Sequence, residues 1–100
     1  MLKHILFNRV RSDEGFTVKL RVFKGFVEYR EDHHVAIIPV YPLVGQVMVH
    51  VLEATPIIWK EPYSSEPIDE ERRRKILERI IEALRFRGCR VEMVKTRLTV

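Results

Sequence analysis

The sequence has little of what marks several common protein classes. It contains one cysteine, Cys89, so an internal disulfide is excluded and a reducing compartment is favoured. Its four glycines are isolated, so no glycine-rich phosphate loop is present. No apolar run is long enough for a transmembrane helix, and the first ten residues lack the apolar segment of a secretion signal. We therefore expect a cytoplasmic protein that does not enter a membrane.

Strong charge asymmetry is also absent. The first fifty residues carry seven Lys/Arg and five Asp/Glu, and the second fifty carry eleven and nine, so each half has a net charge of +2. A modest excess that is spread evenly is a weak signal for nucleic-acid binding. What remains is an ordinary composition, 46% hydrophobic and 32% charged over 100 residues, which predicts a single folded domain spanning residues 1–100.

Alternating apolar residues predict strands in the first half. Residues 16–23 place Phe16, Val18, Leu20 and Val22 on one face, which is the period of a half-buried strand. Further strand-like segments follow, separated by turn-like stretches near residues 11–15, 24–25, 31–33 and 42–46. Short turns indicate antiparallel hairpins.

One amphipathic helix is predicted at about residues 69–87. Asp69 is a suitable N-cap, and Gly88 stands where a left-handed residue would end the helix. Alternation resumes afterwards and predicts a final strand at about residues 89–95. The expected fold is α+β, an antiparallel sheet of about five to six strands with the helix packed on one face.

The sequence contains little that resembles a catalytic or metal-binding motif. The four histidines are His4, His33, His34 and His50, and the adjacent pair should point in different directions from a strand or turn. The serines fall in turn-like segments without a base at a supporting spacing. We expect no enzymatic activity, no cofactor and no metal site.

The basic run at residues 72–75 does not form one patch, because consecutive helical residues point about 100° apart. Phe86 projects from the side of the helix opposite Ile80 and Leu84. Either the C-terminal residues 98–100 cover Phe86, which we favour, or it faces a partner.

The segment IIWKEPYSSEPI, residues 57–68, is the best candidate for a functional surface. It holds the only tryptophan, Trp59, and it leads into a stretch with five acids and no base between residues 61 and 71. Aromatic side chains on a stiff, proline-containing loop are typical of interface anchors. The opposing interpretation is equally strong, because a tryptophan that ends a strand usually covers the core and acids belong at a helix N-terminus. The candidate protein-binding residues are Trp59, Glu61, Tyr63, Glu66, Glu70 and Glu71.

The same segment carries a resemblance to a known family. The features are a Trp-x-x-Pro stretch, a Glu-Pro-Ile-x-Glu-Glu helix start and a final Val-Glu strand, here Trp59 to Pro62, Glu66 to Glu71 and Val91-Glu92. From about residue 24 to 94 the chain resembles the predicted bacterial immunity proteins of family seventy-four in polymorphic toxin systems. The resemblance implies a domain that binds and neutralises a cognate toxin, and it implies no catalytic residues. The acidic segment suggests a basic toxin, because complementary charge speeds encounter.

Two other functions remain open. The protein could be a structural or regulatory homodimer that pairs through edge strands or through the face that holds Phe86. It could also be a weak nucleic-acid binder that uses its scattered arginines, although the even charge makes this the least favoured alternative.

Overall fold

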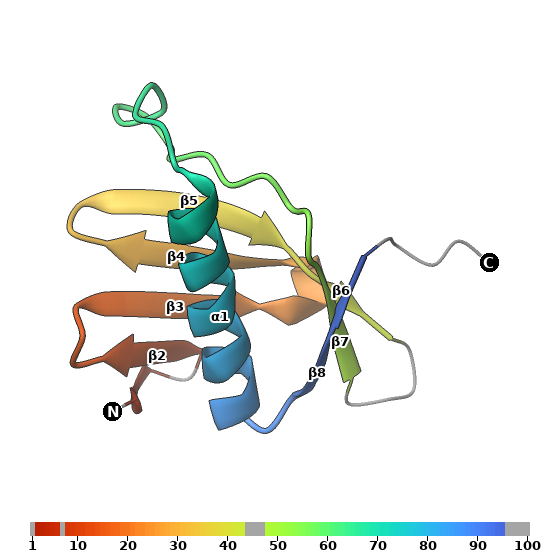
Figure 1. The fold of residues 1–100 in the computed structure, drawn as a ribbon. Helices are drawn as coiled ribbons and strands as arrows, with labels where there is room; N and C mark the ends of the chain where they lie inside the picture. The colour runs from red at the N-terminus through yellow and green to blue at the C-terminus, as the bar shows by residue number, and fades with distance from the viewer. Residues whose placement is uncertain (1, 7, 44–47, 96–100) are drawn as a thin grey trace.

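The computed structural model describes residues 2–6, 8–43 and 48–95, and of residues 3–6 it describes the backbone only. A five-stranded antiparallel sheet forms from consecutive strands in the order β1-β2-β3-β4-β5 (Figure 1). Its strands are β1 (Leu2–Leu6), β2 (Arg9–Ser12), β3 (Phe16–Arg21), β4 (Phe26–Glu31) and β5 (His34–Pro39). The hairpins that the short turns predicted are confirmed.

Residues with positive φ make the turns between these strands. Gly15 has a φ of 97° in the β2–β3 turn, and Gly25 has a φ of 89° after the short 3-10 helix η1 (Val22–Lys24) that joins β3 to β4. The β4–β5 turn uses Asp32 and His33, with φ values of 50° and 60°. Two consecutive left-handed residues match the right-handed twist of a two-residue hairpin, so β4 and β5 pair along their full length.

The remaining strands form a second sheet in the order β6-β7-β8, from β6 (Tyr41–Pro42), β7 (Met48–Leu52) and β8 (Arg90–Val94). The final strand predicted at 89–95 is present, and it pairs with β7 in parallel. The α+β class is confirmed, with the difference that the strands divide between two sheets. A parallel pair needs a long crossover, and helix α1 provides it.

Helix α1 (Glu70–Phe86) begins and ends as its capping residues predict. The Asp69 carboxylate accepts a hydrogen bond from the backbone N–H of Arg72 at 2.7 Å. At the other end, Gly88 has a φ of 88°, and the N–H groups of Gly88 and Cys89 donate to the carbonyls of Arg85 and Leu84. No helix of the described residues has the length and apolar character needed to cross a membrane.

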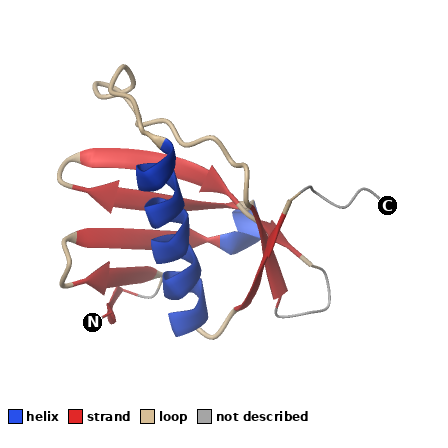
Figure 2. Ribbon diagram, in the orientation of Figure 1, coloured by secondary structure: helices blue, strands red, loops and turns tan. Residues whose placement is uncertain are grey.

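The core lies between α1 and one face of the large sheet (Figure 2). The helix contributes Ile76, Leu77, Ile80, Ile81, Ala83 and Leu84. The sheet contributes alternate residues of its central strands, among them Val18, Val27 and Tyr29, all of which are fully buried. Phe86 is 42% exposed, and the predicted cover for it, residues 98–100, lies outside the described residues.

Candidate protein-binding surface

Trp59 is the residue around which the segment after β7 is organised. An isolated antiparallel bridge joins it to Ala36 in β5, and the N–H of Lys60 donates to the carbonyl of Val35 at 2.7 Å. The indole ring is 6% exposed and stacks on the ring of Tyr29 with centroids 6.3 Å apart. Trp59 is therefore part of the core, and it holds the segment against the edge of the sheet.

A histidine continues this attachment into the loop. The ring of His34 lies edge-on to Trp59 at 5.1 Å between centroids and stacks on Tyr63 at 3.8 Å. Its Nε2 lies 2.8 Å from a carboxylate oxygen of Glu66. The backbone N–H of Glu66 donates to the carbonyl of Tyr63 at 3.0 Å, so the loop is folded on itself as well as tied to β5. Tyr63 and Glu66, both predicted site residues, are thus brought together by a residue that the sequence analysis did not single out.

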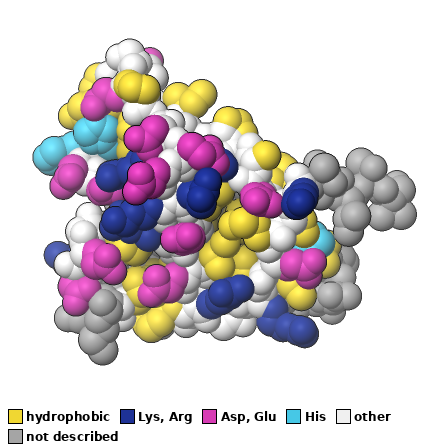
Figure 3. Space-filling view, viewed as in Figure 1, with side chains coloured by type: hydrophobic (Ala, Val, Ile, Leu, Met, Phe, Trp, Pro, Cys, Tyr) yellow, Lys and Arg dark blue, Asp and Glu magenta, His cyan; other side chains and the backbone are white. Residues whose placement is uncertain are grey.

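The acids of this region divide into those with partners in the fold and those that point outward. Glu70 is paired with Arg73 at 2.5 Å, and this hydrogen bond lowers the pKa of the Glu70 carboxyl. Glu61 accepts a hydrogen bond from the Ser64 hydroxyl, which leaves its charge in place. Glu71 is exposed and has no ion-pair partner among the described residues. Figure 3 shows acidic and basic side chains intermixed over the face of the molecule that carries α1.

The basic run at the start of α1 is also divided, as the helical geometry predicted. The Nη1 atom of Arg73 donates to the backbone carbonyls of Glu53 at 2.6 Å and Thr55 at 3.2 Å, so it ties the helix to the chain after β7. Arg72 is paired with Glu31 across the helix–sheet interface, and Arg74 lies 3.8 Å from Glu70. The run contributes to packing rather than to one basic patch.

Two exposed isoleucines join the candidate surface. Because Trp59 is opposite Ala36 in an antiparallel bridge, Ile58 is opposite Ile37 and both lie on the face of the sheet away from α1. Ile58 is 66% exposed and Ile37 is 39% exposed. This pair could not be predicted from the sequence, because it depends on a contact between residues twenty-one positions apart, the difference between 37 and 58. Each isoleucine, taken alone, looks like any other strand residue.

A polar cluster lies at the margin of the interface between α1 and the sheet. Arg79 donates to the Tyr29 hydroxyl at 2.7 Å and to Glu31 at 3.2 Å, and its guanidinium lies 4.6 Å from the centroid of the Phe16 ring. The Tyr29 hydroxyl in turn donates to Glu31 at 2.7 Å. Burial raises the pKa of Tyr29 well above its ordinary value, so the hydroxyl stays protonated as a donor. These contacts are satisfied within the protein and serve the packing of the helix.

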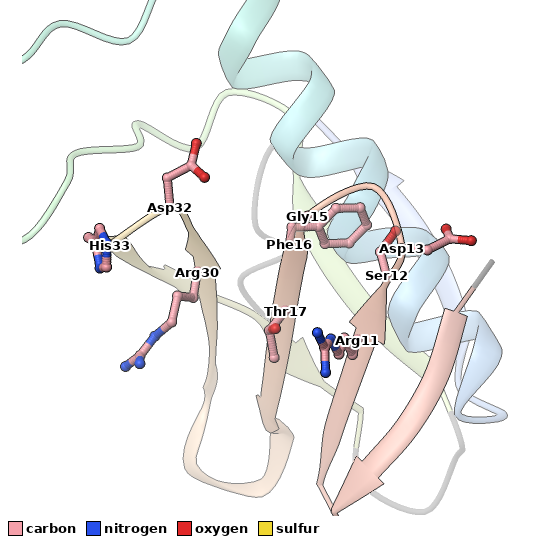
Figure 4. Close-up of a pocket in the computed structure, with 9 residues that line it drawn as sticks. All are labelled: Arg11, Ser12, Asp13, Gly15, Phe16, Thr17, Arg30, Asp32 and His33. Atoms are coloured by element: carbon pink, nitrogen blue, oxygen red, sulfur yellow. The ribbon is translucent and has the colours of Figure 1, made fainter.

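A pocket of about 610 Å³ lies at the end of the large sheet, beside the β2–β3 and β4–β5 turns (Figure 4). Ser12 and His33 both line it. The Ser12 hydroxyl accepts a hydrogen bond from the N–H of Glu14 at 3.0 Å, which is the role of a turn residue.

No group of three or more potential metal ligands gathers within residues 2–6, 8–43 and 48–95. Burial raises the pKa of the Cys89 thiol, which makes it a weak nucleophile at neutral pH.

The fold and this surface define a small α+β domain with a loop held firmly against one sheet edge. The model of a known family, described as Immunity protein 74, matches residues 19–94. The chain therefore belongs to the Immunity protein 74 family, and the resemblance inferred from its tryptophan segment and helix start is confirmed. No curated protein and no solved structure matches the chain.

Proposed function

We propose that this protein is an immunity protein that binds and neutralises a cognate toxin at the β5 edge of its large sheet. The proposed contact surface surrounds this edge. It includes Ile37 and Ile58 on the sheet face away from α1, the loop residues Glu61, Tyr63 and Glu66, and Glu70 and Glu71 in the first turn of α1. Membership of the Immunity protein 74 family supplies the role. The proposal includes no catalysis and no cofactor, and it places the protein in the cytoplasm.

The observation that carries this assignment is the way the loop is held. A bridge at Trp59, a ring stack on Tyr63 and a polar contact at Glu66 fix the loop before any partner arrives. A surface that is ordered in advance loses less conformational entropy on binding.

In this proposal Trp59 acts from beneath the surface. Its ring is buried, so it positions Ile58 and Lys60 on either side of it in the chain. The apolar contact with the toxin is made by Ile58, whose side chain is 66% exposed. The exposed carboxylates of Glu61 and Glu71 favour a toxin whose contact surface is basic.

The test combines capture with protection from toxicity. The tagged protein is used to capture its partner from lysate of its own source cells, and the captured protein is then expressed alone and together with the immunity protein. We expect toxicity when it is expressed alone and growth when both are present. A captured protein that is harmless alone, or that remains toxic with its partner, would contradict the proposal.

Charge-matched variants locate the surface. Glu61→Lys with Glu71→Lys should abolish protection, because two repulsive charges enter the contact. The control is Glu78→Lys with Glu82→Lys, which makes the same change of net charge at exposed positions farther along α1 and should leave protection intact. Equal loss in both pairs would show that net charge rather than this surface matters.

A further inference from the structure

The face of the large sheet that points away from α1 collects the basic residues of β2, β3 and β4. Antiparallel partners share a face, and the register pairs Arg9 with Lys19 and both Arg11 and Arg30 with Thr17. The last residue of β3, Arg21, follows Lys19 on the same face. Figure 4 shows Arg11, Thr17 and Arg30 on three neighbouring strands, with the ring of Phe16 on the side of α1.

This face has a clear excess of positive charge. On β2, β3 and β4 it has five cations, Arg9, Arg11, Lys19, Arg21 and Arg30, and one acid, Glu28, which lies 3.9 Å from Arg30. The described side chains of these three strands therefore give the face a net charge of +4, five cations less one acid. Cations that are scattered along the sequence are gathered on one surface by the pairing of the strands.

The basic face is uncovered within the described residues. None of its five cations is buried, whereas the alternate residues Val10, Val18 and Tyr29 on the side of α1 are fully buried. Neighbouring strands lie about 4.8 Å apart and same-face residues along a strand about 6.7 Å apart, so the cations form a continuous field. Such a field attracts a chain of regularly spaced negative charges.

An exposed aromatic residue lies in the connection between β3 and β4. Phe23 in η1 is 100% exposed, and it lies between Arg21 and Lys24 in the turn that joins β3 to β4. A free ring beside basic side chains is the arrangement on which an unpaired nucleobase stacks. A duplex keeps its bases stacked on one another, so a single strand is the form that uses both the cations and the ring.

We propose that the uncovered face of β2, β3 and β4 binds the phosphodiester backbone of a single-stranded nucleic acid, with Phe23 as a stacking platform for one base. This surface shares the sheet face of Ile37 and Ile58 and adjoins them where Glu28 pairs with Ile37, but its cations lie on β2, β3 and β4, and its proposed ligand goes beyond the proposed immunity function. The cations neutralise phosphates, and contacts to the phosphate backbone carry no sequence information, so binding is expected to be largely independent of sequence.

The test uses the purified chain and a fluorescein-labelled oligothymidylate about 16 nucleotides long, with binding followed by anisotropy across a salt series. Each neutralised phosphate contributes about −0.7 to the slope of log K against log salt for a single strand. The variant Arg9→Gln, Arg11→Gln, Lys19→Gln should make this slope shallower by about 2, and Phe23→Ala should weaken binding by about tenfold.

The matched control removes three charges elsewhere. The variant Arg74→Gln, Lys75→Gln, Arg90→Gln has the same net charge, and its exposed positions lie on α1 and β8. We expect this control to keep the slope of the native protein, and circular dichroism to show native folding for both variants. An equal loss in both variants would overturn the assignment, because binding would then follow net charge alone.

Two competitors test the class of ligand. A duplex of the same length should bind more weakly than the single strand, and polyglutamate of equal charge should compete poorly. Tighter binding of the duplex, or polyglutamate binding that depends on Arg9, Arg11 and Lys19, would overturn the proposal and indicate duplex or an acidic protein surface instead. The toxin is absent from these measurements, and protection by the Arg9/Arg11/Lys19 variant in cells tests the immunity proposal separately.

Discussion

The acidic segment at residues 61–71, which runs from the loop into the first turn of α1, differs from the basic face of β2, β3 and β4 in one respect. The acids are neighbours in the sequence, whereas the basic residues become neighbours only through the fold. The acids are close in sequence, yet the fold gives Glu66 and Glu70 partners at His34 and Arg73. The basic residues are scattered over twenty-two positions from Arg9 to Arg30, yet strand alternation brings them onto one face with a single acid. A run of like charges in a sequence is therefore a poorer guide to a charged surface than the period and pairing of its strands.

A third region clarifies the comparison. On the side of the sheet that faces α1, the cations are used inside the fold, since Arg79 binds Tyr29 and Glu31 and Arg72 binds Glu31. On the opposite side, Arg11 is exposed, and the register pairs it with Thr17 in β3 and with Lys3 in β1, neither of which is an acid. The same residue type therefore makes contacts within the fold on one face and is exposed on the other.

The largest expected effect is the loss of the ring that holds the acidic loop. Trp59→Ala should lower the free energy of unfolding by about 3–5 kcal/mol, because a buried aromatic side chain is removed and the cavity does not refill completely. The ring is 6% exposed and stacks on Tyr29, so the expected loss is that of a buried aromatic side chain. Urea denaturation followed by circular dichroism measures the change.

The neighbouring residue is the control. Ile58→Ala should change the free energy of unfolding by no more than about 0.5 kcal/mol, because the Ile58 side chain is 66% exposed. The two variants together separate the residue that holds the loop from the residue that faces the partner. If Trp59→Ala cost as little as Ile58→Ala, the loop would not depend on this ring, and the comparison between a fixed loop and an open face would fail.

Local signals predicted the helix and its ends correctly because their causes are local. Asp69 contacts a backbone group three residues away, and Gly88 adopts the left-handed conformation that ends a helix. The division into two sheets depends on β7 pairing with β8 across the whole helix, a contact that no short pattern encodes. The buried position of Trp59 was one of two equal interpretations, because only the bridge to Ala36 decides which way the ring points.

The candidate surfaces, too, could be predicted from the sequence only where their residues lie close together in the chain. The acids and Tyr63 could be named from the sequence, since they cluster within eleven positions from Glu61 to Glu71. His34, which attaches Tyr63 and Glu66 to β5, could not be named, because its partners are twenty-nine and thirty-two positions away. The alternation of apolar and polar residues at 16–23 can be read from the sequence. The basic surface cannot, because the cations of β2, β3 and β4 become neighbours only through the register of these strands.

An intermediate effect tests the contrast between the two sides of the sheet. Arg79→Ala should lower the free energy of unfolding by about 1–3 kcal/mol, because Tyr29 and Glu31 lose a charged donor at the interface with α1. Arg11→Ala on the uncovered face should stay within about 0.5 kcal/mol. Thermal or urea unfolding of the two variants measures the difference. Equal losses would mean that the basic face also has a structural role, which would weaken its assignment as a ligand surface.

Apart from the two control variants, the smallest expected effect on stability concerns the attachment of the loop at His34. His34→Ala removes both the stack on Tyr63 and the contact with Glu66, whereas His34→Phe keeps an aromatic ring and removes the contact with Glu66. Both groups are partly exposed, so the free energy of unfolding should fall by at most about 1 kcal/mol. The change should be local: hydrogen exchange at the Glu66 amide, which donates to Tyr63, should quicken by about fivefold in His34→Ala and by less in His34→Phe. If exchange at Glu66 were unchanged in His34→Ala, the bridge at Trp59 alone would order the loop. If it quickened equally in both variants, the contact with Glu66, and not the ring stack, would hold the acids in place for a partner.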